Sequence, residues 1–307
     1  MNLEIYQMII LIGIGLLVGI SISFVGQTGQ GVVLPIVLLF TGDVFLAIAV
    51  NLLNDLITSF IVSIRYIRRK QFKITRDILI IIGIGVIVTV FGVSILMTTP
   101  LGKIYGWLIP LIITCLGLFF LKNGFPTTDK VKKMVINIKR KILKKRVKNN
   151  QSEPVQNDQD IISQPIIEEF EGYIIKGTKI YYSLAIIFGA FVGINSGLFG
   201  GSSGLIFVLA LVIIYSYPLK KGVGTALILS VTVGLVTFMT YQVLGFMIFR
   251  TFFIDIQISI FLAIGSITSG LIASTYIQKM SAVTMGRTIG IVIIILGITS
   301  LIVYLTQ

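Results

Sequence analysis

An apolar stretch from about residue 8 to residue 40 is interrupted by Gly26-Gln27-Thr28-Gly29-Gln30-Gly31, and an equivalent stretch 174 positions later is interrupted by Gly200-Gly201-Ser202-Ser203-Gly204. We call these segments the first break and the second break. A helix in hydrocarbon cannot lose backbone hydrogen bonds cheaply, so polar, glycine-rich segments persist there only where protein buries them or where they line a wet cavity. Matching interruptions in two halves of a chain indicate a transporter's substrate site.

The composition is that of a polytopic membrane protein. The chain of 307 residues is 55% apolar and only 12% charged. Eight apolar runs reach the roughly 20 residues that cross a bilayer at about 1.5 Å per residue. They lie at about 8–26, 44–65, 77–98, 104–121, 180–199, 222–243, 256–277 and 285–305, and two shorter runs, 31–41 and 204–216, follow the breaks. We therefore predict an all-α polytopic membrane protein with about eight transmembrane helices, including a broken or re-entrant helix in each half.

The two halves are predicted to be a duplication of a four-helix unit. Gly26 aligns with Gly200, and one extra residue then brings Ala47 opposite Gly222. An even number of spans per unit predicts parallel repeats, related by an axis along the membrane normal. The chain then divides into a first transmembrane repeat at 1–122, a linker at 123–178 and a second transmembrane repeat at 179–307.

The formal charge of +13 would suit a nucleic-acid partner, but the positions of the basic residues indicate membrane topology instead. With eight spans and a cytoplasmic start, twenty Lys and Arg fall on the inner side: six from Arg65 to Arg76, thirteen from Lys122 to Lys179, and Arg250. Five fall outside: Lys103, Lys220, Lys221, Lys279 and Arg287. The positive-inside rule then predicts a multi-pass protein of the cytoplasmic membrane with both termini cytoplasmic, and no nucleic-acid partner.

The linker at 123–178 changes from basic to acidic along its length. Between residues 130 and 148, apolar residues recur at helical spacing among lysines and arginines. This pattern predicts a helix on the inner leaflet, with anionic membrane lipids as its partner. The alternative is a solvated, partly disordered linker. The segment could also serve as a binding module, and a homo-oligomer is possible on sequence grounds.

Several chemistries are excluded or disfavoured by what the sequence lacks. Cys115 is the one cysteine and there is no histidine. We therefore expect no disulfide within the chain, no histidine-ligated metal, no cofactor and no Ser-His or Cys-His catalysis. A membrane enzyme using Asp55 with Ser202 and Ser203 is a weak alternative, because no neighbouring group is available to activate a serine. We predict no catalytic residues.

The breaks are predicted to bind an anion. The N–H groups freed at the start of a half-helix, together with the aligned peptide dipoles, favour negative charge. Asn51 and Thr225 come early in the helices that follow, where lining residues are expected. The predicted substrate-binding residues are Gly26, Gln27, Thr28, Gly29, Gln30, Gly31, Asn51, Gly200, Gly201, Ser202, Ser203, Gly204 and Thr225. The alternatives are that the glycines serve helix packing and that the Thr225 hydroxyl bonds a carbonyl one turn back.

Asp55 is the acidic residue that lies well inside a predicted span, one turn after Asn51. A charge at the bilayer centre is costly, so an intramembrane carboxyl group is a functional candidate by default. We predict that Asp55 couples transport to protons. The alternative is a structural carboxyl group that is hydrogen-bonded to neighbouring helices. Ser230 occupies the corresponding place in the second half, so a proton site would be asymmetric.

These motifs resemble the sulfite exporter TauE/SafE family of membrane permeases, which includes 4-toluene sulfonate uptake permease-like proteins. Its members carry a Gly-x-Gly-Gly-Gly-like turn in each of two repeats, a proline five residues on, and then a Pro-Leu-Lys-Glu-Ala-Val-Gly-Thr-Ser-like segment. Here the first proline place holds Pro35, and the second copy continues as Pro218-Leu219-Lys220-Lys221-Gly222-Val223-Gly224-Thr225-Ala226. The chain departs from the family in lacking three consecutive glycines, in Leu209 at the second proline place, and in Asn51 and Ala226 at serine places.

The resemblance implies a permease for sulfite, an organosulfonate or a related sulfur-containing or carboxylate anion. A secondary transporter working by alternating access fits both the resemblance and the paired breaks. No Walker motif is present, so the driving force would be an ion or proton gradient or the membrane potential. An anion channel with the same site remains the closest alternative.

Overall fold

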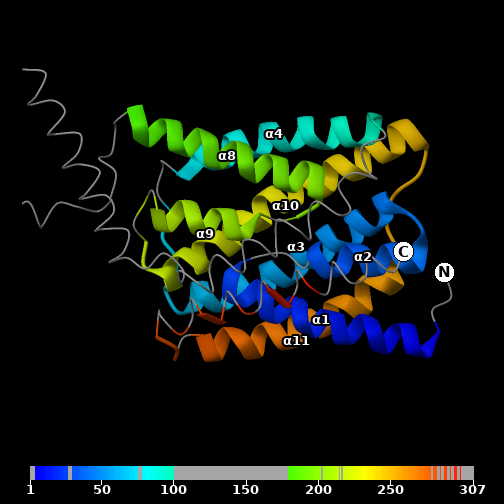
Figure 1. Cartoon of the computed structure of the whole chain (residues 1–307), viewed down its shortest axis with the longest axis horizontal. Coiled ribbons are helices and arrows are strands. Elements are labelled where there is room, and N and C mark those ends of the chain that lie inside the picture. The colour runs from blue at the N-terminus through cyan, green and yellow to red at the C-terminus, as the bar shows by residue number, and fades with distance from the viewer. Residues whose placement is uncertain are drawn as a thin grey trace, which may run out of the picture.

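The computed structural model describes residues 4–26, 30–74, 78–99, 179–201, 203–213, 215, 217–277 and 279–281, with single positions at 284, 287, 288, 291, 294, 295 and 298. The predicted span 104–121 and the linker at 123–178 lie outside these residues, and the span 285–305 is described only at isolated positions. The described elements are the helices α1 (Ile5–Val25), α2 (Gln30–Thr41), α3 (Val44–Arg68), α4 (Ile78–Thr98), α8 (Lys179–Phe199), α9 (Gly204–Ile213), α10 (Leu219–Phe249) and α11 (Ile256–Ile277), as Figure 1 shows.

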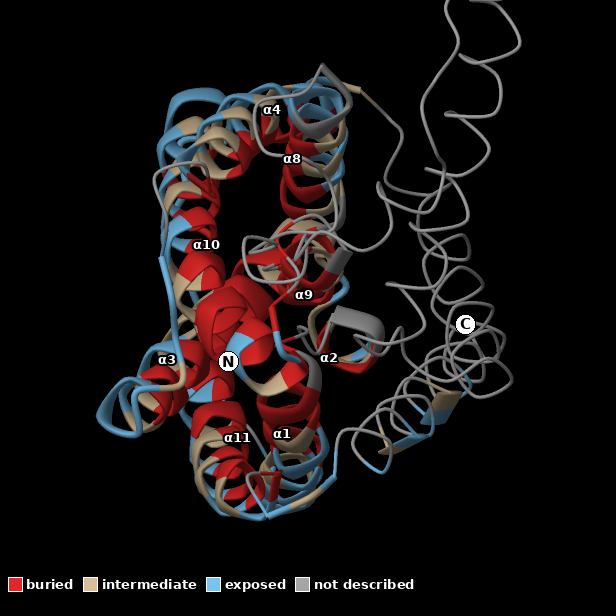
Figure 2. Ribbon diagram, turned by 90° about the vertical axis from the view of Figure 1, so that its left-hand side faces the viewer, coloured by how far each residue is buried: buried red, intermediate tan, exposed pale blue. Residues whose placement is uncertain are grey.

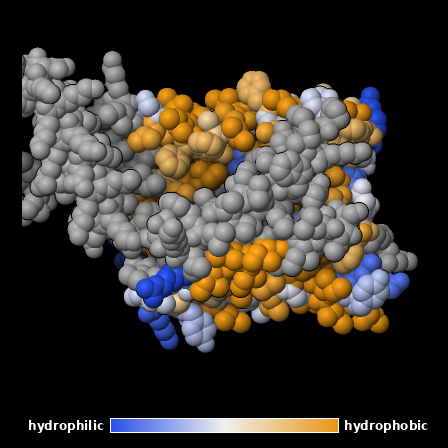
Figure 3. All heavy atoms as spheres, viewed as in Figure 1, coloured by the Kyte–Doolittle hydropathy of each residue, from blue (hydrophilic) through white to orange (hydrophobic). Residues whose placement is uncertain are grey.

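Five of these helices, α1, α3, α4, α10 and α11, are long and apolar enough to cross a membrane. Large apolar side chains face outward from them, for example Ile5, Phe91 and Met247. Figure 3 shows hydrophobic residues over the middle of the visible face and hydrophilic ones toward its left and right ends. Such a surface suits lipid around the middle and water at both ends. The prediction of an all-α polytopic membrane protein is confirmed.

Both predicted breaks are present. α1 ends at Gly26, whose φ is 65°, and α8 ends at Gly200, whose φ is 64°. A residue in this left-handed conformation commonly ends a helix, and glycine adopts it without a Cβ penalty. A new helix then begins at Gln30 in the first half and at Gly204 in the second.

The two longest helices run antiparallel. Phe45 at the start of α3 packs against Phe249 at the end of α10, with ring centroids 5.4 Å apart. At the other end, Thr225 near the start of α10 is hydrogen-bonded to Lys73, just beyond the end of α3. The sequence prediction had placed these two helices parallel.

α1 and α11 both run parallel to α3. The contacts follow in one order along all three helices: Thr58 and Gly19 meet Ser266, and Val62 and Ser23 meet Gly270. α1 and α3 therefore start at the same end of the molecule. Only Gly42 and Asp43 separate α2 from α3, and the Asp43 carboxylate caps α3 by accepting from the backbone N–H of Phe45 at 2.8 Å. α2 thus returns toward the end at which α1 began.

The second half has the opposite sense. α8 runs parallel to α4, because Gly189 lies against Ile81 and Gly197 against Thr89, and α4 runs back from the end of α3. The order α8, α9, α10, α11 therefore repeats α1, α2, α3, α4 with every direction reversed (Figure 1). The prediction of parallel repeats is wrong. The prediction assumed that each broken helix and the half-helix after it together cross the membrane once. In the structure the half-helix instead returns to the side on which the broken helix began.

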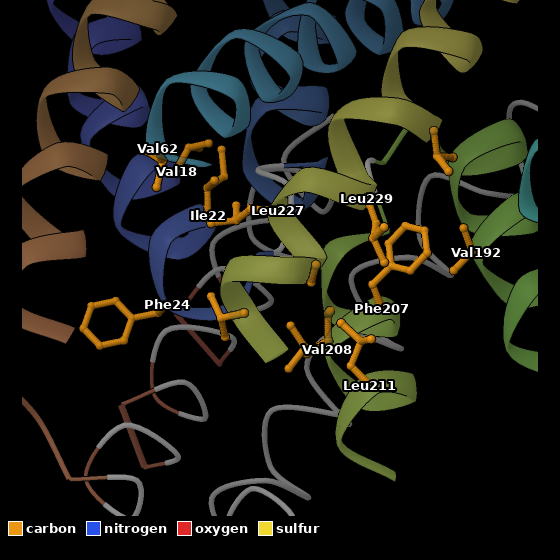
Figure 4. Packing of buried hydrophobic residues seen from close by; sticks show 14 of the residues in the cluster. Val18, Ile22, Phe24, Val62, Val192, Phe207, Val208, Leu211, Leu227 and Leu229 are labelled. Atoms are coloured by element: carbon orange, nitrogen blue, oxygen red, sulfur yellow. The ribbon is translucent and has the colours of Figure 1, made fainter. Parts of the chain in front are cut away.

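Each outer helix pair takes one helix from each half. α1 packs on α11, and α8 packs on α4, in both cases where glycines let backbones approach closely. Figure 2 shows these pairs on opposite sides of the molecule, with α3 and α10 between them. The core lies where α1, α9 and α10 meet: Figure 4 shows Ile22 beside Leu227, and Phe207 beside Leu229.

The ends of the molecule differ in charge. We call the end where α3 finishes and α10 starts the basic end; among the described residues it carries Arg65, Arg68, Arg69, Lys70, Lys73, Lys179, Lys220, Lys221 and Lys279. The described charges at the opposite end are Arg250 with Glu4, Asp43 and Asp255. The first residues of α1 are at this opposite end, away from the basic residues.

Candidate functional site

The two breaks touch each other. A methyl group at position 204 would overlap the carbonyl oxygen of Gly26, so the first residue of α9 lies directly against the end of α1. Only glycine at position 204 permits this approach of two backbones. The two breaks therefore meet inside the molecule.

Each break also packs on the long helix of the other half. A side chain at Gly200 would overlap Ile48 of α3, and the Gly200 carbonyl oxygen accepts a hydrogen bond of 2.8 Å from Nδ2 of Asn51. Gly26 lies beside Ala226 of α10. Ala226 occupies the position that aligns with Asn51, so each break contacts the equivalent position on the long helix of the other half. The first break consequently lies toward the basic end, near the start of α10, and the second toward the opposite end, near the start of α3.

Two tyrosines hold the ends of the broken helices. The hydroxyl of Tyr66 on α3 donates to the carbonyl oxygen of Ser23 at 3.0 Å. The hydroxyl of Tyr241 on α10 donates to the carbonyl oxygen of Gly197, also at 3.0 Å. Both accepting residues lie three positions before their break glycine. The sequence interpretation missed this pair, although the two tyrosines occupy aligned positions in the two halves, which is a signal that could have found them.

The hydroxyl of Ser203 is used within the second break. Ser203 has a φ of 58°, and its hydroxyl accepts from Nδ2 of Asn195 at 3.1 Å, lies 2.8 Å from the hydroxyl of Ser196 and donates to the carbonyl oxygen of Val192 at 2.7 Å. Ser203 was predicted to contact substrate. Its hydroxyl instead ties the second break to α8, together with Asn195, which the sequence interpretation did not identify.

A buried polar group lies on α3 beside the second break. Asp55 is fully buried, and Nδ2 of Asn51 lies 3.4 Å from its Oδ2. On the adjoining face, the hydroxyl of Ser266 donates to Oδ1 of Asn54 at 2.8 Å and lies 2.7 Å from the hydroxyl of Thr58. Asp55 therefore has polar neighbours, as both the coupling hypothesis and its structural alternative require.

Several buried polar atoms near these groups have no hydrogen-bond partner within the part of the chain that the structure describes. They are the hydroxyls of Ser21, Ser59 and Ser230, Oδ1 of Asn51 and Nδ2 of Asn54. A buried polar atom without a partner costs roughly 1–3 kcal/mol. Such atoms mark places where water, an ion or substrate would be stabilised.

Thr225, which is predicted to line the substrate site, is hydrogen-bonded to the loop after α3. Its hydroxyl oxygen accepts from the backbone N–H of Lys73 at 3.0 Å and lies 3.4 Å from the Lys73 carbonyl oxygen. It therefore ties the loop after α3 to the start of α10. The alternative bond to a carbonyl one turn back is not the contact that the structure contains.

The remaining predicted residues are covered unevenly. Gln27, Thr28, Gly29 and Ser202 lie outside the described residues; Gln30 and Gly31 form the first turn of α2. The backbone N–H of Gly201 donates to the carbonyl oxygen of Asn195 at 3.3 Å. Within the described ranges, no three His, Cys, Asp or Glu side chains come together as a metal site.

Comparison with known proteins gives one match. The family model described as Sulfite exporter TauE/SafE matches residues 11–300, a range that includes both breaks and every described helix except the first residues of α1. No curated protein and no solved structure matches the chain.

Proposed function

The chain belongs to the sulfite exporter TauE/SafE family, and we propose that it is a secondary transporter that moves a small anion across the cytoplasmic membrane by alternating access. The proposed substrate is sulfite, an organosulfonate or a related sulfur-containing or carboxylate anion. Members of this family are membrane transporters of sulfur anions rather than enzymes. The observation that supports the proposal most strongly is the contact between the first break at Gly26 and the second at Gly204.

This contact brings two half-helix starts toward one place. α2 leads from the first break to the opposite end, and α9 leads from the second break to the basic end. Their N-terminal ends therefore point inward from opposite directions. Each such end presents free N–H groups and a partial positive charge, and both favour an anion. A site between two halves of opposite direction suits alternating access. When the two halves swap conformations, the site closes to one side of the membrane and opens to the other.

The charge asymmetry supports one orientation. Most of the described basic residues lie at the basic end, whereas Arg250 lies at the other, so the positive-inside rule favours a cytoplasmic basic end. The start of α1 then lies on the outer side, in contrast with the sequence prediction. If the predicted span 285–305 crosses once more, the C-terminus also lies outside. The sequence-based orientation differs because it took α1 to run antiparallel to α3, whereas the two helices run parallel.

The driving force is proposed to involve Asp55 and the membrane potential. An inside-negative potential favours anion exit by about 2.3 kcal/mol per charge per 100 mV. A proton carried on Asp55 would reduce the net charge that crosses with the anion. The support for this role is the position of Asp55, which is fully buried on α3 and adjoins Asn51, whose amide is bonded to the second break.

The proposal is tested by counterflow in proteoliposomes. The purified protein is loaded with unlabelled sulfite, thiosulfate, sulfate, sulfoacetate, taurine or a simple carboxylate, and uptake of the labelled anion is followed. A transporter gives saturable uptake that is stimulated by the internal anion. Flux that does not saturate and is insensitive to internal anion would indicate a channel, and no flux of any anion above protein-free liposomes would refute the proposal.

A further inference from the structure

The aligned tyrosines contact the same backbone atom in each half. The hydroxyls of Tyr66 and Tyr241 donate to the carbonyl oxygens of Ser23 and Gly197, each at 3.0 Å, and both side chains are fully buried. The bonds come from residues 43 and 44 positions away along the chain. The two halves therefore share this long-range contact, although the side-chain hydrogen bond of Asn51 in one half has no counterpart at the aligned Ala226 in the other.

The contact has a specific electrostatic consequence. The last carbonyls of a helix lack intrahelical donors and form the negative end of its dipole. In each half the break glycine donates a hydrogen bond to one of these carbonyl oxygens: the N–H of Gly26 donates to the carbonyl oxygen of Ile22, and the N–H of Gly200 donates to that of Ser196. The tyrosine hydroxyl donates to the carbonyl oxygen of the next residue, Ser23 or Gly197. This hydrogen bond therefore offsets negative charge within one turn of a site proposed to hold an anion.

The two tyrosines lie at opposite depths. Tyr66 is at the basic end: its carbonyl oxygen accepts from the N–H of Gln71 at 3.0 Å, and its ring adjoins Gly224 near the start of α10. Tyr241 is toward the other end, in the cluster that contains Phe253 and Leu52. Each tyrosine therefore holds the break that is nearer to its own end of the molecule.

We propose that Tyr66 and Tyr241 are positioning residues of the anion site, and that each controls substrate affinity from one side of the membrane. This inference rests on the proposed transport function. Tyr66 keeps the first break in the shape that admits substrate from the cytoplasmic basic end. Tyr241 does the same for the second break from the outer end.

The test uses the full-length protein with Tyr66→Phe, Tyr241→Phe and the matched control Tyr276→Phe, whose side chain is 63% exposed on α11. Phenylalanine keeps the ring and removes only the hydroxyl. Labelled sulfite uptake is measured in inside-out and right-side-out vesicles. We expect Tyr66→Phe to raise KM about two- to tenfold from the cytoplasmic side only, and Tyr241→Phe to do so from the outer side only, which is the range for one lost hydrogen bond. Tyr276→Phe should change neither.

Amide hydrogen exchange provides a readout that does not depend on transport. Tyr66→Phe should speed exchange in peptides around residue 26 and leave those around residue 200 unchanged, and Tyr241→Phe should do the reverse. Equal KM changes from both sides would overturn the sided role, and unaltered exchange at both breaks would overturn the positioning role. If wild-type protein carries no anion, the proposed function and the sided role both fail, while exchange still decides whether the tyrosines position the breaks.

Discussion

The glycines that end α1 and α8 share their backbone conformation, whereas the polar contacts of the residues around them differ. In the second break, the Ser203 hydroxyl has three partners on α8, and Asn51 reaches in from α3. In the first half, the residue aligned with Asn195 is Ser21 on α1, whose hydroxyl has no partner among the described residues, and the residue aligned with Asn51 is Ala226. Among the described residues, the second break is therefore held by side-chain hydrogen bonds, whereas α1 has a buried hydroxyl without a partner at Ser21.

The largest effect is expected where the two breaks touch. Gly204→Ala should abolish anion counterflow, because the new methyl group would overlap the Gly26 carbonyl oxygen. Overpacking of this kind typically costs 1–3 kcal/mol, so thermal unfolding should also shift to lower temperature. Gly83→Ala on α4 is the matched control, since nothing lies within 4 Å of the added methyl group. Normal counterflow by Gly204→Ala would show that the breaks need not meet.

The next effect concerns the polar group beside the second break. Asp55→Asn keeps the shape of the side chain and cannot ionise. In proteoliposomes we expect this variant to lose accumulation driven by a pH gradient while it still exchanges anion for anion. Thr58→Val, which removes a neighbouring buried hydroxyl on the same helix, should retain the pH response. Full pH-driven accumulation by Asp55→Asn would assign the carboxyl group a structural role.

A pair of serine variants compares the breaks directly. Ser203→Ala removes a hydroxyl with three partners, so the free energy of unfolding should fall by about 1–3 kcal/mol. Ser21→Ala removes a buried hydroxyl without a described partner, so stability should be unchanged or slightly higher, while KM for the anion rises if the first break contacts substrate. Thermal unfolding and counterflow measure both. The reverse pattern, with Ser21→Ala the more destabilising, would contradict the asymmetry.

The smallest effect is expected at the loop beside the first break. Thr225→Val removes the hydrogen bonds to Lys73 and should lower the free energy of unfolding by about 1 kcal/mol, with KM within twofold of wild type. Thr232→Val, on the exposed surface of the same helix, is the control for stability. A large rise in KM would support the substrate contact that the sequence predicts for Thr225.

The sequence by itself determined the local features of this protein. Apolar length set the helices, because only a helix or a closed barrel satisfies its backbone in hydrocarbon. Gly26 and Gly200 set where two helices stop, because a left-handed residue at a helix end is a property of one residue.

Only the tertiary structure decided the direction of each half-helix after its break. A glycine ends a helix without specifying whether the chain continues across the membrane or returns; for α2 the packing against α3 and the short link at Gly42 and Asp43 decide it. That choice reverses the predicted relation of the halves and, in the proposed orientation, the predicted side of the start of α1 and of the loops at both ends of α10. The pairing of Tyr66 with Ser23, and the inward turn of the Ser203 hydroxyl, likewise depend on helices that are brought together by packing rather than on the residues next to them.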